Sequence, residues 1–481
     1  MQSEVQEMYV DVALPLALDT PLTYSVPKCL WERALPGMRV LVPMQSRLIL
    51  GFVVAVTREC SLETVKTVVD FPDTGPVFDK NMLDLCKWVA DYYCCSWGEA
   101  LSAALPAAVK SGVRRRYRLA PDQLSEGRFT ERQRTVIAAL YNGKTPLTAR
   151  QIASAAGGRA LSNTLASLVK RGILLEELLF REEGNAALTE TRVRLVEEAV
   201  PDSDALMALQ RRAPRRAAVY LDLLYGEREQ AATALYQKHR ANKTILDALE
   251  TMGLIKRFQT EMYRMPDIQT DTRAENKHVL NAEQRNALDA LLEAVRKRSY
   301  TTFLLRGITG SGKTEVYLQA IETVLSSGRS AIMLVPEISL TPQTVGRFHA
   351  RFKQDIAILH SGLSDGERYD AWRMARQGKV RIVVGARSAV FAPLPDVGMI
   401  VVDEEHDNSY KQNEAPRYHA RDVAIMRARM SQAVCVLGSA TPSVESFYNS
   451  ETQKSVRLEL TRRATVGRLP EVRLIDMRRE Q

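Results

Sequence analysis

Short apolar runs separated by turn residues dominate the first 110 residues and favour strands. Four such runs are residues 10–14, 22–26, 37–43 and 48–57. In residues 81–93, by contrast, apolar side chains recur every three or four positions, which predicts an amphipathic helix. The pattern therefore predicts a small β-rich module with one helix packed on it, and the helical spacing places Trp88 and Tyr92 in its core.

A weak internal repeat occupies residues 119–270. LASLVKRGIL at residues 165–174 returns 81 residues later as LDALETMGLI at residues 246–255, and shorter helical patterns precede each copy. Helix, turn, helix, glycine and β-prone residues follow one another in the order of a winged helix. The sequence predicts two such units in tandem, with DNA contact and protein contact both open. The basic residues 110–118 before them are expected to form a connector or an exposed strand.

From residue 280 onward, strands alternate with helices, which is typical of a doubly wound parallel sheet. The expected buried strands are residues 301–306, 330–335, 380–384, 398–402 and 433–437. The predicted fold class is therefore multidomain α/β. We expect a β-rich domain at 1–112, a winged-helix region of two units at 113–272 and an ATPase lobe at 273–481.

Composition narrows the class of protein. The chain is 45% apolar and 26% charged, no stretch approaches the ~20 apolar residues of a membrane span, and the first residues are polar. A cytoplasmic protein without a membrane partner is expected. The six cysteines form no C-x-x-C pair, so no zinc ligands can be assigned in this chain. The net charge of +9 favours a polyanionic partner.

The first strand of the predicted sheet is followed by a sequence that fits G-x-x-x-x-G-K-[ST], at residues 307–314. Glycines let backbone N–H groups face a phosphate chain, and the following helix adds its positive end. Lys313 would reach the β and γ phosphates of ATP, and the Thr314 hydroxyl would ligate Mg²⁺. The predicted nucleotide-binding residues of this loop are Gly307, Thr309, Gly310, Ser311, Gly312, Lys313 and Thr314.

Carboxylates follow a second buried strand, in the run MIVVDEEH at residues 399–406. Asp403 is placed at the carboxyl end of the strand to hold Mg²⁺, and Glu404 to polarise the attacking water. With Lys313, they are the predicted catalytic residues of an ATPase.

Two further features complete the predicted motor site. Ser439 and Thr441, in GSAT after another apolar strand, carry hydroxyls that would couple the acidic residues to a moving segment. Gln284 precedes the phosphate loop by one helix, and its amide has the donor and the acceptor that an adenine edge requires.

These motifs resemble, in sequence and in order, the PriA family of primosomal replication-restart helicases of superfamily 2. The matching runs are GITGSGKTEVY, LVPEISLTPQ, HSGLSDGER, VVGARSAVFAP, VVDEEHDNSYKQNEAPRYHARDVA and GSATPS. The amino-terminal run VALPLALDTPLTYSVP also resembles that family's domain for DNA 3′ ends. The resemblance implies a RecA-like lobe and a bacterial, nucleoid-associated 3′-to-5′ helicase. Such an enzyme recognises stalled or branched forks and initiates primosome assembly.

The resemblance also implies contact residues. For DNA they are Tyr24 and Lys66 in the 3′-end pocket, Pro336, Thr341 and Arg387 along the strand, and Tyr410, Lys411, Arg417 and Tyr418 in a loop after the acidic motif. For single-stranded-DNA-binding protein they are Trp88, Tyr92 and Lys454. Other primosome proteins are further implied partners, and a monomer is expected.

The chain departs from the family in three places, of which one is a winged-helix region of two units where the family is expected to have one. Leu22 and Thr23 precede Tyr24 where the family has a Phe-Asp pair, and the sequence reaches Gln481 before the family's second lobe and its zinc region. We therefore expect an incomplete copy of a restart helicase that unwinds little. Two alternatives stay open: a DNA- and protein-binding scaffold with weak or no ATPase, and another superfamily-2 DNA translocase.

Overall fold

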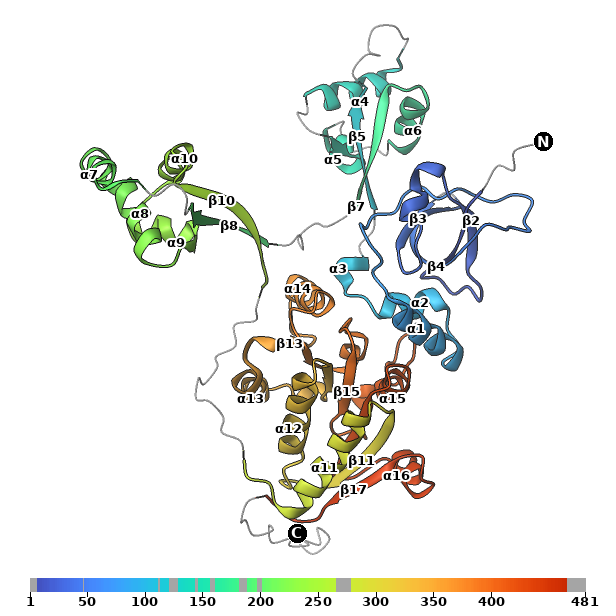
Figure 1. The fold of residues 1–481 in the computed structure, drawn as a ribbon. Helices are drawn as coiled ribbons and strands as arrows, with labels where there is room; N and C mark the ends of the chain where they lie inside the picture. Colours follow the sequence, from blue (N-terminus) through green and yellow to red (C-terminus); the bar gives the residue numbers. More distant parts are fainter. Residues whose placement is uncertain are drawn as a thin grey trace, which may run out of the picture. The chain divides into compact units, whose positions relative to one another are not determined.

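The computed structural model describes residues 7–45, 47–110, 113–120, 129–142, 146–155, 161–180, 188–196, 201–264 and 278–464 (Figure 1). The chain divides into two compact units, residues 184–266 and the remainder. In the described ranges, no helix combines the length and the apolar character that a membrane crossing requires.

The amino-terminal module is a four-stranded antiparallel sheet in the order β2-β1-β4-β3. Its elements are β1 (Tyr9–Ala13), β2 (Leu22–Ser25), the 3₁₀ helix η1 (Lys28–Arg33), β3 (Arg39–Met44) and β4 (Arg47–Thr57). Alternate side chains such as Val10 and Val12 are fully buried, because successive residues of a strand point to opposite faces. The four predicted strands are confirmed.

Three helices follow this sheet: α1 (Lys80–Tyr92), α2 (Trp97–Ala103) and α3 (Ala107–Lys110). The Asp79 carboxylate accepts from the Met82 N–H at 2.8 Å and begins α1. Ser96 and Glu99 form a capping box that begins α2. The predicted helix at residues 81–93 is therefore confirmed.

The predicted core role holds for one of the two aromatic residues on α1. Trp88 is half-buried and packs against the core. Tyr92 is 60% exposed, so its predicted place in the core is wrong. Tyr92 shares a helix face with Leu85, seven residues earlier, but it is the last residue of α1, and its ring stacks on Trp88 with ring centroids 4.8 Å apart.

Gly98 lets α2 approach the end of β1 closely. A Cβ atom at this position would lie 1.7 Å from the Leu14 carbonyl oxygen, which is backbone and cannot rotate away. We expect Gly98→Ala to destabilise the amino-terminal module by about 1–3 kcal/mol, the usual effect of overpacking, or more. Thermal unfolding would measure the loss. Gly75→Ala is the matched control, because nothing lies within 4 Å of its added Cβ; equal unfolding temperatures for both variants would contradict the expectation.

The predicted tandem repeat appears as two small folds with the same order of strand, helix, short strand, two helices and strand. The first comprises β5 (Val113–Leu119), α4 (Glu131–Asn142), β6 (Leu147–Thr148), α5 (Ala149–Ala155), α6 (Ser162–Lys170) and β7 (Leu174–Phe180). Its sheet has the order β6-β5-β7. The basic run after Lys110 thus continues into a strand, which is one of the two predicted forms.

The second small fold forms the unit at residues 184–266. It comprises β8 (Leu188–Leu195), α7 (Ser203–Arg212), α8 (Pro214–Tyr225), β9 (Glu229–Ala231), α9 (Ala232–His239), α10 (Lys243–Thr251) and β10 (Ile255–Met262). Its sheet order is β10-β8-β9. Helices α6 and α10, like strands β7 and β10, begin 81 residues apart, as the repeat predicted, and α7 is an addition to the second copy. The predicted boundary residues 112 and 272 lie outside the described residues and stay predictions.

The carboxy-terminal lobe is built on a seven-stranded parallel sheet in the order β13-β14-β12-β15-β16-β11-β17. Its strands are β11 (Thr301–Gly307), β12 (Ser330–Leu334), β13 (Ile356–Leu359), β14 (Ile382–Gly385), β15 (Val397–Val402), β16 (Val434–Ser439) and β17 (Val456–Leu460). The five predicted strands are confirmed. We did not predict β13 or β17, because β13 has only four residues and the edge strand β17 is mostly exposed.

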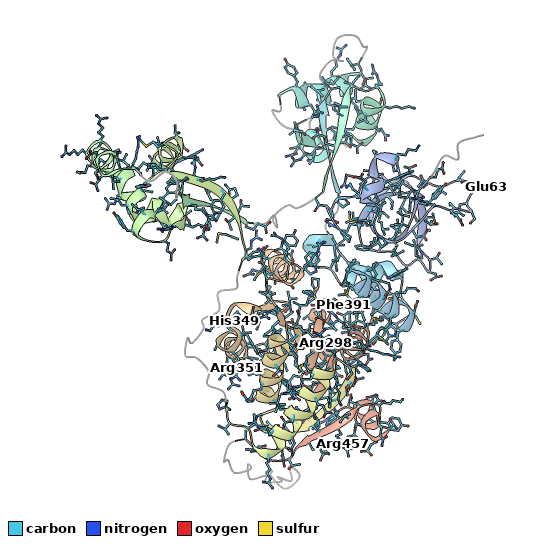
Figure 2. The ribbon with its side chains drawn as sticks, in the orientation of Figure 1. Glu63, Arg298, His349, Arg351, Phe391 and Arg457 are labelled. Atoms are coloured by element: carbon cyan, nitrogen blue, oxygen red, sulfur yellow. The ribbon has the colours of Figure 1, made fainter. Side chains whose placement is uncertain are left out.

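Helices cover both faces of this sheet, as in doubly wound folds. The helical elements are α11 (Ala282–Lys297), α12 (Lys313–Ser326), η3 (Glu337–Ser339), α13 (Pro342–Phe352), η4 (Lys353–Asp355), α14 (Asp365–Arg376), η5 (Arg387–Phe391), η6 (Asn408–Tyr410), α15 (Ala420–Met430) and α16 (Val444–Glu451). One apolar core lies under α11, α12 and α13, and a second under α14 and α15. Arg351 of α13, which Figure 2 labels, forms ion pairs with Glu315 and Glu322 of α12, so these helices are also joined by charge.

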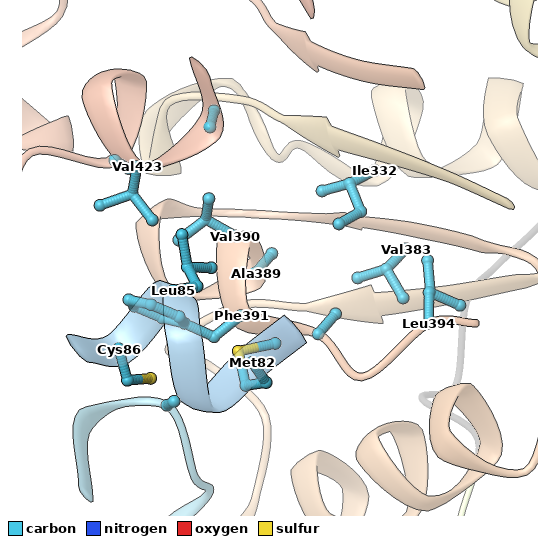
Figure 3. Close-up of a cluster of buried hydrophobic side chains, with 14 of the residues drawn as sticks. Met82, Leu85, Cys86, Ile332, Val383, Ala389, Val390, Phe391, Leu394 and Val423 are labelled. Carbon is cyan, nitrogen blue, oxygen red and sulfur yellow. The ribbon is translucent and has the colours of Figure 1, made fainter. Parts of the chain in front are cut away.

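Helix α1 of the amino-terminal module packs directly on the lobe. Met82, Leu85 and Cys86 of α1 share one buried cluster with Phe391 and Val423 of the lobe (Figure 3). All five side chains are at most 7% exposed. The apolar face of α1 therefore belongs to the core of the lobe as much as to its own module.

Candidate nucleotide-binding and DNA-contacting site

The glycine-rich loop lies where the sequence placed it, between β11 and α12 at the carboxyl end of the sheet. Gly310 and Gly312 have φ values of 78° and 82°, in the left-handed region that side chains disfavour. A Cβ on Gly312 would also lie 2.3 Å from the Gln284 amide nitrogen. Glycine at position 312 therefore serves both the curl of the loop and the close approach of α11.

Lys313 begins α12 with its side chain turned back into the loop. Its Nζ donates to the Gly307 carbonyl at 3.1 Å and lies 3.5 Å from Oε1 of Glu404. The Ser311 hydroxyl is buried and makes no hydrogen bond within the described residues. The Lys313 ammonium and the glycine-rich loop thus form a positively charged pocket beside the Glu404 carboxylate.

Gln284 is attached to this loop. Its amide oxygen accepts from the Asn281 N–H at 2.8 Å, and its amide nitrogen donates to the Ser311 carbonyl at 2.8 Å. The side chain is 3% exposed. Gln284 therefore uses its amide oxygen to cap α11 and its amide nitrogen to hold the phosphate loop against this helix. Its predicted contact with adenine stays a prediction.

Asp403 and Glu404 follow β15 directly, on the strand next but one to β11 in the sheet. The Tyr317 hydroxyl donates to Oδ1 of Asp403 at 3.3 Å, and the Tyr410 hydroxyl donates to the Asp403 carbonyl at 2.6 Å. Burial raises the pKa of Asp403 to about 6, and the neighbouring charge of Glu404 acts in the same direction. A buried carboxyl group whose pKa is raised in this way is typical of a functional site.

Glu405 is a residue whose importance we did not infer from the sequence. It is fully buried and accepts from Arg421 at 3.1 Å, from the Ser443 N–H at 2.7 Å and from the Ser446 hydroxyl at 2.8 Å. It joins the acidic segment to α15 and to the start of α16. Position alone could not distinguish its carboxylate from that of Glu404.

The GSAT segment contacts the acidic segment as expected. The Ser439 hydroxyl lies 2.8 Å from Nδ1 of His406 and accepts from the Thr441 N–H at 2.9 Å. His406 Nδ1 in turn lies 3.8 Å from Glu404. Ser439 is thereby linked to the acidic motif through His406, whereas the coupling roles of Ser439 and Thr441 stay predictions.

One cavity of about 510 Å³ brings the predicted nucleotide residues together. It is lined by Gln284, the loop 308–314, Asp403 and Glu404, with Leu280 and Arg347 beside them. Its size lies in the range of small-ligand sites. The ammonium and backbone N–H groups suit phosphates, and the Thr314 hydroxyl with the Asp403 carboxylate suits Mg²⁺, which prefers oxygen ligands. Within the described ranges, no group of three or more His, Cys, Asp or Glu residues could hold a metal by itself.

The raised pKa of Asp403 predicts a pH-dependent stability. The folded state retains the Asp403 proton up to about pH 6, whereas an unfolded aspartate ionises near 4, so stability falls as the pH rises through this window. The loss reaches about 2–3 kcal/mol. We expect Asp403→Asn, without Mg²⁺, to be more stable than wild type at pH 7.5 but not at pH 4. Urea unfolding at both pH values measures this, and equal stabilities at pH 7.5 would contradict it.

All three predicted DNA-contacting tyrosines are buried in the fold. Tyr410 is fully buried, Tyr418 is 1% exposed and packs edge-on against Phe391, and Tyr24 is 3% exposed in the core of the amino-terminal sheet. In each case the apolar ring gains more from burial in the fold than it could offer at a surface. Burial leaves these rings no free face for base stacking in this structure, and their contact with DNA stays a prediction.

The polar residues predicted to contact DNA are at the surface, with the proline as the exception. Lys66, Thr341, Lys411 and Arg417 are exposed, Arg387 is half-exposed, and Pro336 is buried. Arg387 donates to the Ser409 and Lys411 carbonyls at 3.2 and 2.8 Å, so it fixes the loop after the acidic motif. The Thr341 hydroxyl caps α13. Their contacts with DNA stay predictions.

The predicted partner-binding residues are only partly brought together. Trp88 and Tyr92 form a stacked pair on α1, and Tyr92 presents it to solvent. Lys454 is exposed just after α16, and in the described structure no hydrogen bond or ion pair joins its side chain to either ring. The partner role of the three residues stays a prediction.

The fold and this site define a helicase-type nucleotide-binding lobe. Residues 281–449 match the model of the DEAD/DEAH box helicases, and residues 11–106 match that of the PriA 3′ DNA-binding domain. Replication restart protein PriA of Bacillus subtilis is 38% identical over 98% of this chain and 58% of its own length. The proteins of that name from Chlamydia pneumoniae and Haemophilus influenzae are 30% and 31% identical, over 100% and 95% of this chain and 55% and 52% of theirs.

The chain is therefore PriA-like over nearly its whole length. It spans about half the length of the curated relatives that it matches.

Proposed function

We propose that this chain binds DNA and ATP as part of an ATP-dependent 3′-to-5′ DNA helicase that recognises stalled or branched replication forks and initiates primosome assembly. Its place of action is the replication fork in the cytoplasm. Branched and single-stranded DNA are its nucleic-acid partners, and single-stranded-DNA-binding protein and other primosome proteins are its protein partners.

The observation that carries this proposal is the convergence of Lys313, Asp403 and Glu404 on one cavity, in a chain that also matches the 3′ DNA-binding domain. When ATP and Mg²⁺ are bound, they supply the phosphoryl group and the charge that activates it. Lys313 would hold the β and γ phosphates, Thr314 and Asp403 would hold the metal, and Glu404 would accept a proton from the attacking water. Ser439 and Thr441 would carry changes at this site to the rest of the lobe.

We assign the two repeated folds to winged-helix units. The order of strand, helices and returning strand supports this assignment, and the recurrence of α6 as α10 supports a duplication. Lys411 and Arg417, exposed on the loop after the acidic motif, would contact phosphates of single-stranded DNA.

DNA-stimulated ATP hydrolysis tests the proposal. Forked DNA with a leading-strand 3′ end at the branch should stimulate hydrolysis more than a fork without that end. Stimulation that ignores the 3′ end would favour another superfamily-2 translocase. Fork binding with no hydrolysis under any condition would favour the scaffold, which the intact set of Lys313, Asp403 and Glu404 argues against.

A further inference from the structure

A buried tyrosine reaches the predicted metal-holding carboxylate from inside the protein. Tyr317 lies one helical turn after Lys313 on α12, and its side chain is fully buried. Its hydroxyl donates to Oδ1 of Asp403 at 3.3 Å. Asp403 lines the nucleotide cavity, whereas Tyr317 is not among the lining residues. The hydroxyl therefore contacts the carboxylate on the side away from the space that a ligand would fill.

The Tyr317 hydroxyl needs a reason of its own. A phenylalanine ring would fill the same apolar space, and burying a hydroxyl costs free energy unless it is hydrogen-bonded. Within the ranges that the structure describes, the partner of this hydroxyl is the Asp403 carboxylate. No water can replace that partner around a fully buried side chain. The proton of Tyr317 is therefore directed at Asp403.

Gly438 of the GSAT segment leaves room for this hydroxyl. A Cβ atom at position 438 would lie 1.6 Å from the Tyr317 hydroxyl oxygen and 3.3 Å from Oδ1 of Asp403. The Gly438 carbonyl also accepts from the Glu405 N–H at 3.0 Å, which holds this backbone against the acidic segment. Three elements therefore meet at the hydroxyl: α12, the end of β15 and β16.

The phosphate-binding groups share a helix with Tyr317. Lys313 and Thr314 are the first two residues of α12, and Tyr317 lies in the next turn. Groups held on a helix keep their relative positions more precisely than groups on a loop. The position of the Tyr317 hydroxyl at Asp403 is therefore fixed relative to the phosphate-binding groups.

We propose that Tyr317 is a positioning residue whose hydroxyl orients the Asp403 carboxylate to hold the Mg²⁺ that accompanies ATP. Carboxylates that ligate metals are themselves hydrogen-bonded, and losing such an outer partner typically lowers metal affinity about 10–100-fold. The inference rests on the proposed function, since it assumes that Asp403 holds the metal. It adds a residue from outside the phosphate loop and the acidic motif, and it gives a reason for the glycine in GSAT.

Binding of a fluorescent, non-hydrolysable ATP analogue to the full 481-residue chain tests the proposal. The measured quantity is the ratio of the affinity with saturating Mg²⁺ to the affinity with EDTA, which isolates the contribution of the metal. Tyr317→Phe keeps the buried ring, so the variant is expected to fold. It should lower this ratio about tenfold or more and leave the affinity in EDTA within about twofold of wild type.

Tyr300→Phe is the matched control. It removes a tyrosine hydroxyl from the same lobe, where the Tyr300 oxygen accepts from the Thr302 hydroxyl at 3.0 Å. Tyr300 directly precedes β11, so it lies at the opposite end of that strand from the phosphate loop. The ratio of affinities should be that of wild type.

A double variant shows whether Tyr317 acts through Asp403. Asp403→Asn removes the charged ligand and should itself lower the ratio. Because two residues of one hydrogen-bonded network do not act additively, adding Tyr317→Phe to Asp403→Asn should change the ratio by less than about twofold.

Each outcome decides a separate point. If Tyr317→Phe retains the wild-type ratio, the inference is wrong, although the proposed function survives. If Tyr317→Phe lowers the affinity equally with Mg²⁺ and with EDTA, or still lowers the ratio in the Asp403→Asn background, its hydroxyl supports the loop and not the metal site, and the inference is overturned. If wild type binds the analogue no better with Mg²⁺ than with EDTA, the metal site of the proposed function fails and the inference fails with it.

Discussion

Replacing Lys313 with alanine is expected to reduce DNA-stimulated ATP hydrolysis by about 10²–10³-fold or more, the usual effect of removing one preorganised donor from a site of developing charge. The Lys313 ammonium is held at the loop, 3.1 Å from the Gly307 carbonyl and 3.5 Å from Glu404, where the phosphates would lie. Alanine retains the helix but removes the charge. Steady-state hydrolysis with saturating forked DNA is the measurement.

Fork binding by the same variant should stay within about twofold of wild type, because Lys313 is buried in the nucleotide loop and is not among the residues expected to contact DNA. Lys297→Ala, which removes an exposed lysine on α11, should change neither property. Hydrolysis by Lys313→Ala within tenfold of wild type would show that the turnover comes from another site or from a contaminant.

Replacing Glu405 with alanine is expected to have the largest effect on stability. The Glu405 carboxylate is fully buried, and Arg421, which pairs with it, has a side chain only 12% exposed. Removing one partner of a buried pair typically destabilises by about 3–5 kcal/mol, and the lower end is expected here because Arg421 keeps its ion pair with Asp422 at 3.2 Å. The Ser443 and Ser446 groups lose their acceptor at the same time. Denaturant or thermal unfolding should show this loss.

The neighbouring carboxylate provides the control. The Glu404 side chain is 36% exposed, and its partners are Lys313 at 3.5 Å and His406 at 3.8 Å. Glu404→Ala should therefore abolish hydrolysis and change the free energy of unfolding by less than about 1 kcal/mol. If both variants lose stability equally, Glu405 is no more important for the fold than Glu404.

Elements with a strong local signal were predictable. The phosphate loop needs glycines at left-handed positions and a strand before it, and both can be recognised in one run of consecutive residues. The buried strands of the lobe are continuous apolar runs, because a parallel sheet is covered on both faces. The 81-residue repeat was visible because each copy must build the same small core. The strand β17 escaped prediction because it lies at the sheet edge, where apolar and charged residues alternate and most of its side chains are exposed.

The aromatic side chains whose burial was predicted wrongly were misplaced for one physical reason. An aromatic ring in a loop can stack on a base or fill a core, and the residue type is the same in both cases. Tyr410 and Tyr418 fill the core beneath their loop, whereas Lys411 and Arg417 on the same loop are exposed. Tyr92 shows the converse, since helical spacing suggested a core residue and the ring lies at the surface.

The sequence by itself determined the class of nucleotide site, the parallel sheet that carries it and the resemblance to restart helicases, because these depend on short runs of consecutive residues. Only the tertiary structure separated Glu404 from Glu405, and only it packed Met82 of α1 in one core with Phe391 of the lobe, more than 300 positions away in the sequence. Burial and charge compensation are properties of contacts between distant segments. Residue spacing cannot encode them until the chain has folded.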